Sequence, residues 1–412
     1  MAASFVSRVT QFPKSSAPVL DRNRDGRWLQ VLSHLSPRYG GIASSVPRLA
    51  RATEAAGRHV CPIVGFCAHD ELQDLGEAER DAMKAFSPSR LRWMVDGSLH
   101  RELREMVRAA DGVHIHGLWE THCMTAAGIA QSCRRPYIVS AHGMLEQWAL
   151  RRRRLKKALY AALIEIRVMR RAACLRALSR DEVEDYRRLG LNNPIAIVPG
   201  GVDVPPAAGP ELFRATHPQL RGKRIVLFMG RIDQKKGLNL LLAAWAATVE
   251  RASDLHLMIA GPDCGMLASL RQMTDELRLH DSVTFAGMVS GEQKWSMLAA
   301  ASLFVLPSYS EGFSIAVLEA LATGIPVIVT KPCHIPEVAD HHCGWVIQPQ
   351  LEKLEQALGE FLALSGEEAD EIGRNGRDLA RTKFHSSVVA GQMDQVYEWL
   401  QGGAAPSSVE IV

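Results

Sequence analysis

The sequence predicts an α/β protein with two domains, each built around a parallel sheet and facing the other across a cleft. Three observations support this prediction. Short apolar runs alternate with longer helical patterns throughout, which is typical of βα units and parallel sheets. The chain has 412 residues, enough for two or three domains of ordinary size. A segment rich in proline and glycine, residues 198–210, divides the strand candidates into two groups.

The strand candidates follow one another along both halves, and most are bounded by Gly, Pro, Asn or Asp. In the first half they are residues 28–33, 59–65, 112–116, 137–141, 174–179 and 195–199. In the second half they are residues 224–229, 255–260, 283–286, 303–307, 326–330 and 344–347. Ligands of open α/β sheets bind outside the carboxyl ends of the strands, so we expect the site in the cleft where both sheets end.

The composition excludes several classes of protein. Hydrophobic residues make up 47% and charged residues 23%, as in globular proteins rather than disordered or collagen-like ones. The net charge of +3 is too small for a dedicated nucleic-acid binder, and no uncharged apolar run reaches the ~18 residues that span a bilayer. The eight cysteines include no C-x-x-C pair, and the segment from Cys333 to Cys343 has neither common zinc spacing. We therefore predict reduced thiols, no metal site and a cytoplasmic location.

The most informative segment is residues 303–322, in which an apolar strand ends and a helix begins near Ser314. Serine is a favoured N-cap residue. The backbone N–H groups of Gly312, Phe313 and Ser314 would then point into the cleft. Such a helix start attracts anions, so we predict that it binds phosphate.

Two glutamates flank the start of this helix. Glu311 and Glu319 have seven residues between them, and on the pattern alone they could be a solvated loop acid and a local cap. Their spacing and the residues around them resemble the E-x7-E motif of the retaining enzymes of glycosyltransferase family 4. Residues 229–238 and 198–203 resemble two further segments of that family, and the resemblance covers most of residues 28–400. It implies the GT-B fold, in which two Rossmann-like domains enclose the active site and a C-terminal helix crosses back to the first domain.

The composition and the resemblance together predict the domain limits. Residues 1–27 lack the apolar core of a secretory signal, and we expect a disordered extension or residues outside the native protein. The first, acceptor-side domain is expected at residues 28–205. The second, which would bind the nucleotide sugar, is expected at residues 206–385. The crossing helix would occupy residues 386–402 and a tail residues 403–412.

Two cations are predicted to bind the donor's diphosphate. Arg231 and Lys236 follow a strand, in the loop that opens the first helix of the second domain, so they should face the cleft. A diphosphate leaving group carries about two negative charges, which guanidinium and ammonium groups can neutralise without a metal ion. Both residues lie in a segment that resembles the family, and Lys235 is the less expected neighbour.

The resemblance implies further contacts with the nucleotide sugar. Gly40 and Gly41 resemble the family's double-glycine loop beside the donor, and glycines there let the backbone approach a phosphate closely. Glu311 would hold hydroxyl groups of the sugar. Glu319 would accept hydrogen bonds from the ribose, and the backbone near Met288 would contact the base.

A histidine is predicted to contact the transferred sugar. His142 follows a strand and precedes a glycine, which resembles the position of the family histidine that binds the donor sugar. A lone histidine is more often structural, but the carboxyl end of a strand favours a role in the site. His114 and His116 lie within a strand, and we expect them in the core or supporting the site.

One segment is strongly basic. Residues 151–176 contain ten Lys or Arg and one acidic residue, Glu165, with apolar residues at roughly helical spacing. Such a helix can bind anionic lipids. A solvated helix face is the simpler alternative, and a nucleic-acid site is disfavoured because the only aromatic residue is Tyr160. We favour peripheral contact with the inner face of the cytoplasmic membrane, since enzymes of the resembled family often act on lipid-linked acceptors.

The predicted activity is transfer of a sugar from a UDP-, GDP- or ADP-sugar to an acceptor hydroxyl with retention of anomeric configuration. No further cofactor is expected, and the product would belong to polysaccharide or glycolipid assembly in the cell envelope. Two alternatives stay open. A nucleotide-sugar epimerase of the same architecture is disfavoured by the E-x7-E motif, and an inactive partner subunit is disfavoured because Glu311, Arg231 and Lys236 are all present.

Overall fold

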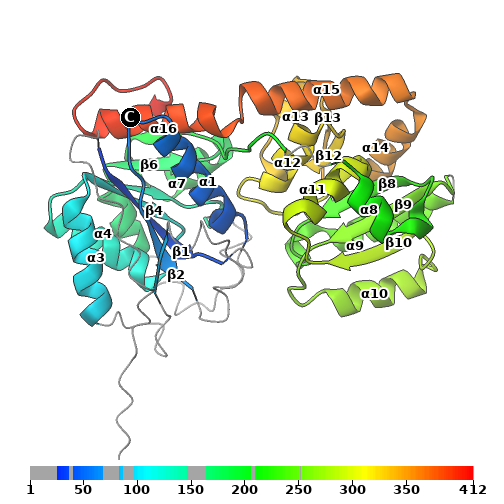
Figure 1. Cartoon of the computed structure of the whole chain (residues 1–412), viewed down its shortest axis with the longest axis horizontal. Coiled ribbons are helices and arrows are strands. Elements are labelled where there is room, and N and C mark those ends of the chain that lie inside the picture. The colour runs from blue at the N-terminus through cyan, green and yellow to red at the C-terminus, as the bar shows by residue number, and fades with distance from the viewer. Residues whose placement is uncertain are drawn as a thin grey trace, which may run out of the picture.

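The computed structural model describes residues 26–36, 40–67, 83–86, 97–145, 164–205, 209–250 and 252–411, which form two α/β domains side by side (Figure 1). Each domain contains one sheet covered by helices, as the sequence predicts. Each strand candidate overlaps a strand of the structure. The fold is therefore the predicted pair of parallel-sheet domains.

The first domain contains an eight-stranded sheet in the order β14-β7-β6-β5-β4-β1-β2-β3. Every strand pair in it is parallel except β14 with β7. The strands are β1 (Trp28–His34), β2 (Ile63–Phe66), β3 (Met83–Phe86), β4 (Gly112–His116), β5 (Tyr137–Ser140), β6 (Cys174–Ala177), β7 (Ile195–Ile197) and β14 (Val409–Glu410). The helices are α1 (Gly41–Ala55), α3 (Gly97–Ala109), α4 (Thr121–Ser132), α7 (Arg180–Arg188) and α16 (Ser386–Leu400), and residues 164–170 are also helical.

The second domain contains a six-stranded parallel sheet in the order β10-β9-β8-β11-β12-β13. Its strands are β8 (Arg224–Met229), β9 (Leu255–Ala260), β10 (Val283–Gly287), β11 (Ala301–Leu306), β12 (Val327–Thr330) and β13 (Gly344–Ile347). Its helices are α8 (Glu211–Thr216), α9 (Leu238–Val249), α10 (Leu267–Glu276), α11 (Gly291–Ala300), α12 (Ile315–Thr323), α13 (Glu337–Asp340), α14 (Leu351–Ala363) and α15 (Gly366–Thr382). The central strands are buried on both faces, which explains their continuous apolar runs.

Successive residues of β1 pack on opposite faces of the first sheet, because side chains alternate along a strand. Leu29 and Val31 join the cluster that includes α3 and α4. Trp28 and Leu32 join the cluster that includes α1 and α16. Buried polar side chains of this domain, including Gln30 and His114, lie on the face of the sheet that α16 covers.

The predicted crossing helix is present. Helix α15 belongs to the second domain, and α16 continues from it onto the first (Figure 1, red). Tyr397 of α16 stacks on Trp28 with ring centroids 4.3 Å apart. The chain crosses between the domains twice, near Val202 and near Ser386, and hydrogen bonds join the two crossings. Val202 N donates to the Phe384 carbonyl at 2.8 Å, and Ser386 N donates to the Val202 carbonyl at 2.9 Å.

Two strands were not predicted. The edge strand β3 has four residues, and β14 has two and lies in the predicted tail. β14 extends the first sheet by pairing antiparallel with β7, so the end of the chain is part of the first domain. The two residues of β14 are too few for a periodic pattern, and Lys84 interrupts the short sequence of β3, which is therefore not an unbroken apolar run.

The first domain also begins earlier than predicted. Gly26 and Arg27 were assigned to the extension, but Arg27 N donates to Asp111 Oδ2 at 2.7 Å and Arg27 pairs with Val60 in a parallel bridge. Residues 1–25 lie outside the described residues. In the part of the chain that the structure describes, no helix is both long and apolar enough to cross a bilayer.

Candidate active site

A cleft of about 750 Å³ lies between the two domains, at the carboxyl ends of strands from both sheets. The structure brings every residue predicted for the site to this cleft. They are Gly40, Gly41, His142, Arg231, Lys236, Met288, Glu311, Gly312, Phe313, Ser314 and Glu319. The roles of these side chains remain predictions, but their convergence from separate parts of the chain is a property of the fold.

The loop after β8 places Lys236 beside Glu311. The Asp233 side chain accepts a hydrogen bond from Lys235 N at 3.1 Å and begins a short 3-10 turn, Gln234–Lys236. Gly237 ends that turn at φ 68°, and a Cβ there would clash with the Pro307 carbonyl. Only glycine lets this loop lie so close to the end of β11, where Glu311 follows.

Lys236 and Glu311 form an almost buried ion pair, with side chains 12% and 8% exposed. Ser308 Oγ also donates to Glu311 Oε1, at 2.8 Å. Burial acts to raise the pKa of Glu311, but the ammonium groups of Lys236 and Lys235 and the hydrogen bonds from Lys236 and Ser308 outweigh it, so the pKa is lowered. Glu311 is therefore an oriented carboxylate at neutral pH.

The second glutamate is held by cations from both domains. Glu319 Oε1 lies 2.8 Å from Lys294 Nζ of α11 and 3.4 Å from an Arg48 nitrogen of α1. Arg48 also donates to the Gly201 carbonyl at 3.0 Å and pairs with Asp203 at 3.3 Å. Arg48 thus connects the first domain, the linker and the donor side of the cleft.

Arg48 and Lys294 were not among the residues predicted for the site. A signal was available for Arg48, because it lies seven residues after Gly41 in the same helix and residues at that spacing share a face. Lys294 lies outside the motifs that carry the family resemblance, and the packing of α11 against α12 brings it to Glu319. It also lies over the Trp295 ring, 4.5 Å from the centroid.

Two helix starts open onto the cleft. Gly40 precedes α1 at φ 109°, and neither a side-chain cap nor an acidic residue occupies the first turn of α1. Ser314 holds the N-cap position of α12, as predicted, but its side chain makes no capping hydrogen bond. Both helix starts can therefore accept an anion. A Cβ at Gly40 would lie 3.9 Å from Arg231 Nε, so the first-domain loop and this guanidinium face each other.

His142 occupies a strained position at the end of β5, with φ 54° in the left-handed region. Its Nε2 lies 3.1 Å from His116 Nδ1. Burial and the positive charge of Arg176 lower the pKa of His142 to about 3, so the imidazole is uncharged at neutral pH. A neutral ring suits a hydrogen bond to a sugar hydroxyl better than charge neutralisation of a phosphate. A Cβ at Gly312 would clash with the His142 carbonyl, so glycine permits the domains to touch here.

The remaining predictions concern Met288 and metal binding. Met288 lies in the cleft wall and is 48% exposed. Among the residues that the structure describes, no group of three or more His, Cys, Asp or Glu could hold a metal ion. In the segment from Cys333 to Cys343, Cys333 is buried and donates to the Leu306 carbonyl, and His334 pairs with Asp181 across the domains.

The basic segment is only partly described, since residues 151–163 lie outside the described residues. One of its cations, Arg176, is not on the protein surface. Arg176 is 3% exposed, and its guanidinium donates to the Val198 carbonyl at 3.0 Å and the Pro199 carbonyl at 2.7 Å. Its inclusion in a lipid-binding face was wrong, because its position in β6 directs it into the interior.

Comparison with known proteins agrees with this geometry. Residues 40–201 match the family model "Glycosyl transferase 4-like domain", and residues 211–379 match "Glycosyl transferases group 1". The phosphatidyl-myo-inositol mannosyltransferase of Mycolicibacterium smegmatis is 27% identical over 88% of this chain and 91% of its own length. The GDP-mannose:cellobiosyl-diphosphopolyprenol alpha-mannosyltransferase of Xanthomonas oryzae is 28% identical over 82% and 87%.

A third relative matches only in part. The MMP alpha-(1->4)-mannosyltransferase of Mycolicibacterium hassiacum is 31% identical, and the match spans about half of each protein, 49% of this chain and 47% of the relative. Two solved structures share the fold along almost the whole chain. Sucrose-phosphate synthase from Thermosynechococcus elongatus has a TM-score of 0.72 at 21% identity, covering 92% of this chain and 100% of that one. Anabaena HepE with UDP-glucose has a TM-score of 0.73 at 17% identity, covering 90% and 99%.

Proposed function

The chain belongs to the group 1 glycosyl transferases and has the GT-B fold, and on this premise we propose that it transfers a sugar from a nucleoside diphosphate to an acceptor hydroxyl with retention of anomeric configuration. One observation carries the proposal. Arg231 and the paired Lys236 and Glu311 of the second domain share a cleft with the open helix start at Gly40 of the first. This arrangement suits a diphosphate with a sugar attached.

The phosphates would lie between the two domains. Arg231 offers a planar guanidinium that can bond two phosphate oxygens, and Lys236 offers a point charge. The N–H groups at the start of α1 would complete the cradle from the other side. With these fixed charges stabilising the departing diphosphate, we propose that no metal ion is needed.

The two glutamates would hold the rest of the donor. Glu311 is already fixed by Lys236 and Ser308, so its carboxylate can orient sugar hydroxyl groups. Glu319 would exchange its contact with Arg48 for the ribose hydroxyl groups, and the backbone near Met288 would contact the base. The UDP-glucose in the HepE structure supports a nucleotide sugar as the guest of this fold.

We propose that configuration is retained without a carboxylate nucleophile. Glu311 is committed to Lys236, so positioning is its task rather than attack on the anomeric carbon. The acceptor oxygen would instead form its bond to that carbon on the face from which the diphosphate departs. As the bond between carbon and diphosphate breaks, a phosphate oxygen takes the acceptor proton. The protein's contribution is to position both groups and stabilise the developing charge.

The acceptor is proposed to be a membrane lipid or a lipid-linked saccharide. The relatives from M. smegmatis and X. oryzae are named for a phosphatidylinositol and a polyprenol-linked acceptor, and both are mannosyltransferases. GDP-mannose is therefore the first donor to test. Assembly of a glycolipid or of a cell-envelope polysaccharide would be the outcome.

Peripheral contact with the membrane is part of this proposal. In the described end of the basic segment, Arg167 and Arg170 are exposed whereas Glu165 and Met169 are buried, so the cations face outward. Changing the preceding arginines 151–154 together to Gln should release the protein from anionic vesicles and leave transfer to a soluble acceptor intact. Binding should weaken as salt rises, because screening limits the field to about 8 Å at physiological ionic strength. Wild-type protein that fails to sediment with anionic vesicles at low salt would show that these cations are only solvated.

The activity is tested with a panel of GDP-mannose, UDP-glucose and ADP-glucose against lipid and lipid-linked acceptors. The readouts are nucleoside diphosphate release and the anomeric configuration of the product by NMR. Retained configuration supports the proposal, and inversion contradicts it. An epimerised sugar formed without acceptor would indicate an epimerase, and a folded protein inactive with every pair would indicate a partner subunit.

A further inference from the structure

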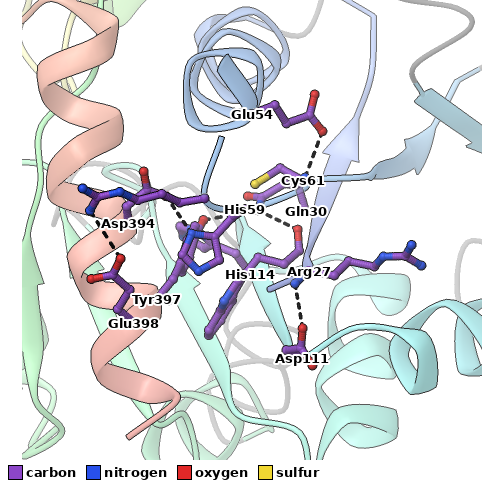
Figure 2. Close-up of polar contacts among 12 residues, drawn as sticks. Arg27, Gln30, Glu54, His59, Cys61, Asp111, His114, Asp394, Tyr397 and Glu398 are labelled. Carbon is purple, nitrogen blue, oxygen red and sulfur yellow. Dashed lines mark hydrogen bonds and ion pairs between the residues drawn. The ribbon is translucent and has the colours of Figure 1, made fainter. Parts of the chain in front are cut away.

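A chain of hydrogen bonds runs from His142 through the interior of the first domain to the crossing helix. His142 Nε2 lies 3.1 Å from His116 Nδ1, and His116 Nε2 lies 2.9 Å from Gln30 Oε1. Gln30 Nε2 lies 3.2 Å from Tyr397 Oη, and Tyr397 Oη lies 2.9 Å from His114 Nδ1. Figure 2 shows Gln30, His114 and Tyr397 gathered between the sheet and α16.

The fold itself assembles this chain. In the parallel register of β1 and β4, Gln30 pairs with His114 and Leu32 with His116, so these side chains share the face covered by α16. Tyr397 reaches them from α16 and is held there by its stacking on Trp28. None of these contacts belongs to the donor cleft except the one at His142.

The orientation of the Gln30 amide gives the chain a direction. Gln30 Nε2 also lies 3.0 Å from the Trp28 carbonyl, which can only accept a hydrogen bond. The amide nitrogen must therefore face Trp28 and Tyr397, and Oε1 must face His116. Oε1 can only accept, so His116 Nε2 carries a proton.

The proton of His142 follows from that of His116. His116 is fully buried, and burial together with His114, His142 and Arg176 lowers its pKa well below the usual value, so it carries one proton. Since that proton is on Nε2, His116 Nδ1 is an acceptor. The hydrogen bond from His142 to His116 then requires a proton on His142 Nε2. His142 Nδ1 is left as a bare acceptor, and among the described residues no group bonds to it.

We propose that Gln30, held by Tyr397 and the Trp28 carbonyl, is a positioning residue that fixes His142 in the tautomer with its proton on Nε2. His142 Nδ1 then accepts a hydrogen bond from a hydroxyl of the sugar being transferred. This inference rests on the proposed function for the identity of the ligand, but the tautomer is a property of the free protein. The opposite tautomer would present an N–H group to the cleft and would repel a donated hydroxyl proton.

The rest of the chain runs in the same direction. Tyr397 Oη accepts from Gln30 Nε2 and donates its single proton to His114 Nδ1, and His114 Nε2 donates to Ser140 Oγ at 2.8 Å. Consecutive hydrogen bonds with one polarity strengthen one another. Through this chain of hydrogen bonds, the crossing helix supports His142 in the cleft without itself touching the ligand.

The first experiment needs no variant. Long-range ¹H–¹⁵N spectra of protein labelled at histidine distinguish the two neutral tautomers, and His142→Asn assigns the signal. We expect His142 to carry its proton on Nε2. A proton on Nδ1 in the wild-type protein would overturn the proposal whatever the enzyme's substrate proves to be.

The second experiment breaks the chain at its centre. Gln30→Met keeps the size of the side chain and removes the acceptor for His116, so the tautomers of His142 should mix or reverse. The kcat/KM for the nucleotide sugar should fall roughly tenfold, as for loss of one hydrogen bond. The Kd of the free nucleoside diphosphate, which lacks the sugar, should not change. Tyr397→Phe should cause a smaller loss, since the Trp28 carbonyl still orients the amide.

The matched control is Tyr137→Phe. The Tyr137 hydroxyl accepts from Gln131 at 3.0 Å and donates to the Val168 carbonyl at 2.6 Å, away from this chain. It should alter stability without altering the His142 tautomer. In a His142→Ala background, Gln30→Met should have no further effect on kcat/KM. A full additional tenfold loss there, or an unchanged tautomer in folded Gln30→Met, would show that Gln30 is only structural.

Discussion

Both glutamates of the cleft are paired with lysines before any donor arrives. Lys236 pairs with Glu311, and Lys294 pairs with Glu319. Burying a charge without a partner is costly, so each member of a pair makes the burial of its partner possible. At the residue scale, a donor that contacts these glutamates or lysines must therefore exchange existing ion pairs. Removing one member of a pair has consequences for both stability and activity.

Lys236→Met should lower turnover by about a hundredfold, on the order of 3 kcal/mol, because a cation that stabilises the leaving diphosphate is lost. It should also destabilise the protein by about 3 kcal/mol, since Glu311 remains buried without its main partner. Only 12% of the Lys236 side chain is exposed, so its loss should affect stability as well as turnover. Urea unfolding and steady-state kinetics measure the two effects.

The loss of stability in Lys236→Met should depend on pH. In the wild type the lowered pKa of Glu311 contributes stability that is present above the unfolded-state pKa and is lost as pH falls through the folded-state pKa. Without Lys236, the lowering by its charge and its hydrogen bond is lost while burial still acts, so we expect the pKa of Glu311 to rise. The variant's loss of stability relative to the wild type should therefore become smaller as the pH falls from about 7 to about 4.

Two comparisons isolate the ion pair. Lys236→Met combined with Glu311→Gln should recover much of the stability but none of the turnover. Arg231→Ala should lower turnover by a similar factor of about a hundred with little change in unfolding, because Arg231 is in no ion pair within the described residues. Wild-type turnover in the Lys236 variant would refute the phosphate assignment.

Metal independence is a second prediction at this scale. Because Arg231, Lys236 and Lys294 can carry the neutralisation of the diphosphate, transfer should persist in EDTA. Initial rates with and without the chelator, followed by re-addition of Mg²⁺ or Mn²⁺, provide the measurement. A loss that either ion restores would show that the fixed cations are insufficient.

At the scale of elements, the end of the chain completes the first sheet. Ile197 N donates to the Ser408 carbonyl at 2.8 Å, Val409 pairs with Ala196, and Glu410 pairs with Arg180. This edge leads directly into the linker that lines the cleft. A two-residue strand thus protects the last strand before the second domain.

Removing residues 404–412 should accelerate hydrogen exchange at the Ile197 amide, because its acceptor is lost. The expected cost in stability is about 1 kcal/mol, the value of a typical hydrogen bond. Exchange mass spectrometry measures the effect, and peptides from β8 in the other sheet serve as the internal control. Unchanged exchange at Ile197 would mean that β14 contributes no protection.

At the scale of the whole molecule, a few contacts hold the domains together in the absence of a donor. Arg48 of the first domain reaches Glu319 of the second, and Asp181 pairs with His334. Glycines at positions 200 and 312 allow the opposing surfaces to touch. Binding of a donor at Glu319 would therefore alter the same contacts that set the distance between the domains.

Arg48→Ala should open the cleft in the free protein, since its ion pair with Glu319 is almost buried and less screened than a surface pair. Small-angle X-ray scattering should record a larger radius of gyration than in the wild type. Arg58→Ala is the matched control, because Arg58 pairs with Glu398 on the exposed surface of the first domain. Equal radii for wild type and Arg48→Ala would show that other contacts set the closed form.

Local pattern was sufficient for most of the architecture. Apolar runs identified the central strands because both faces of a parallel sheet are buried. Loops at the carboxyl ends of strands then placed Arg231, Lys236 and Glu311 at the cleft, since their place relative to a strand is a local property. The helix start at Ser314 was found for the same reason, although its side chain does not cap.

The sequence by itself determined the two-domain α/β fold, the site segments and the family. Tertiary structure alone decided which side chains meet. Glu319 meets Arg48, His142 reaches Gln30 and Tyr397 through His116, and β14 pairs with β7. These partners are separated by long stretches of chain, so no periodicity relates them. Their contacts depend on strand order and on the return of α16, which only the packing of the whole chain specifies.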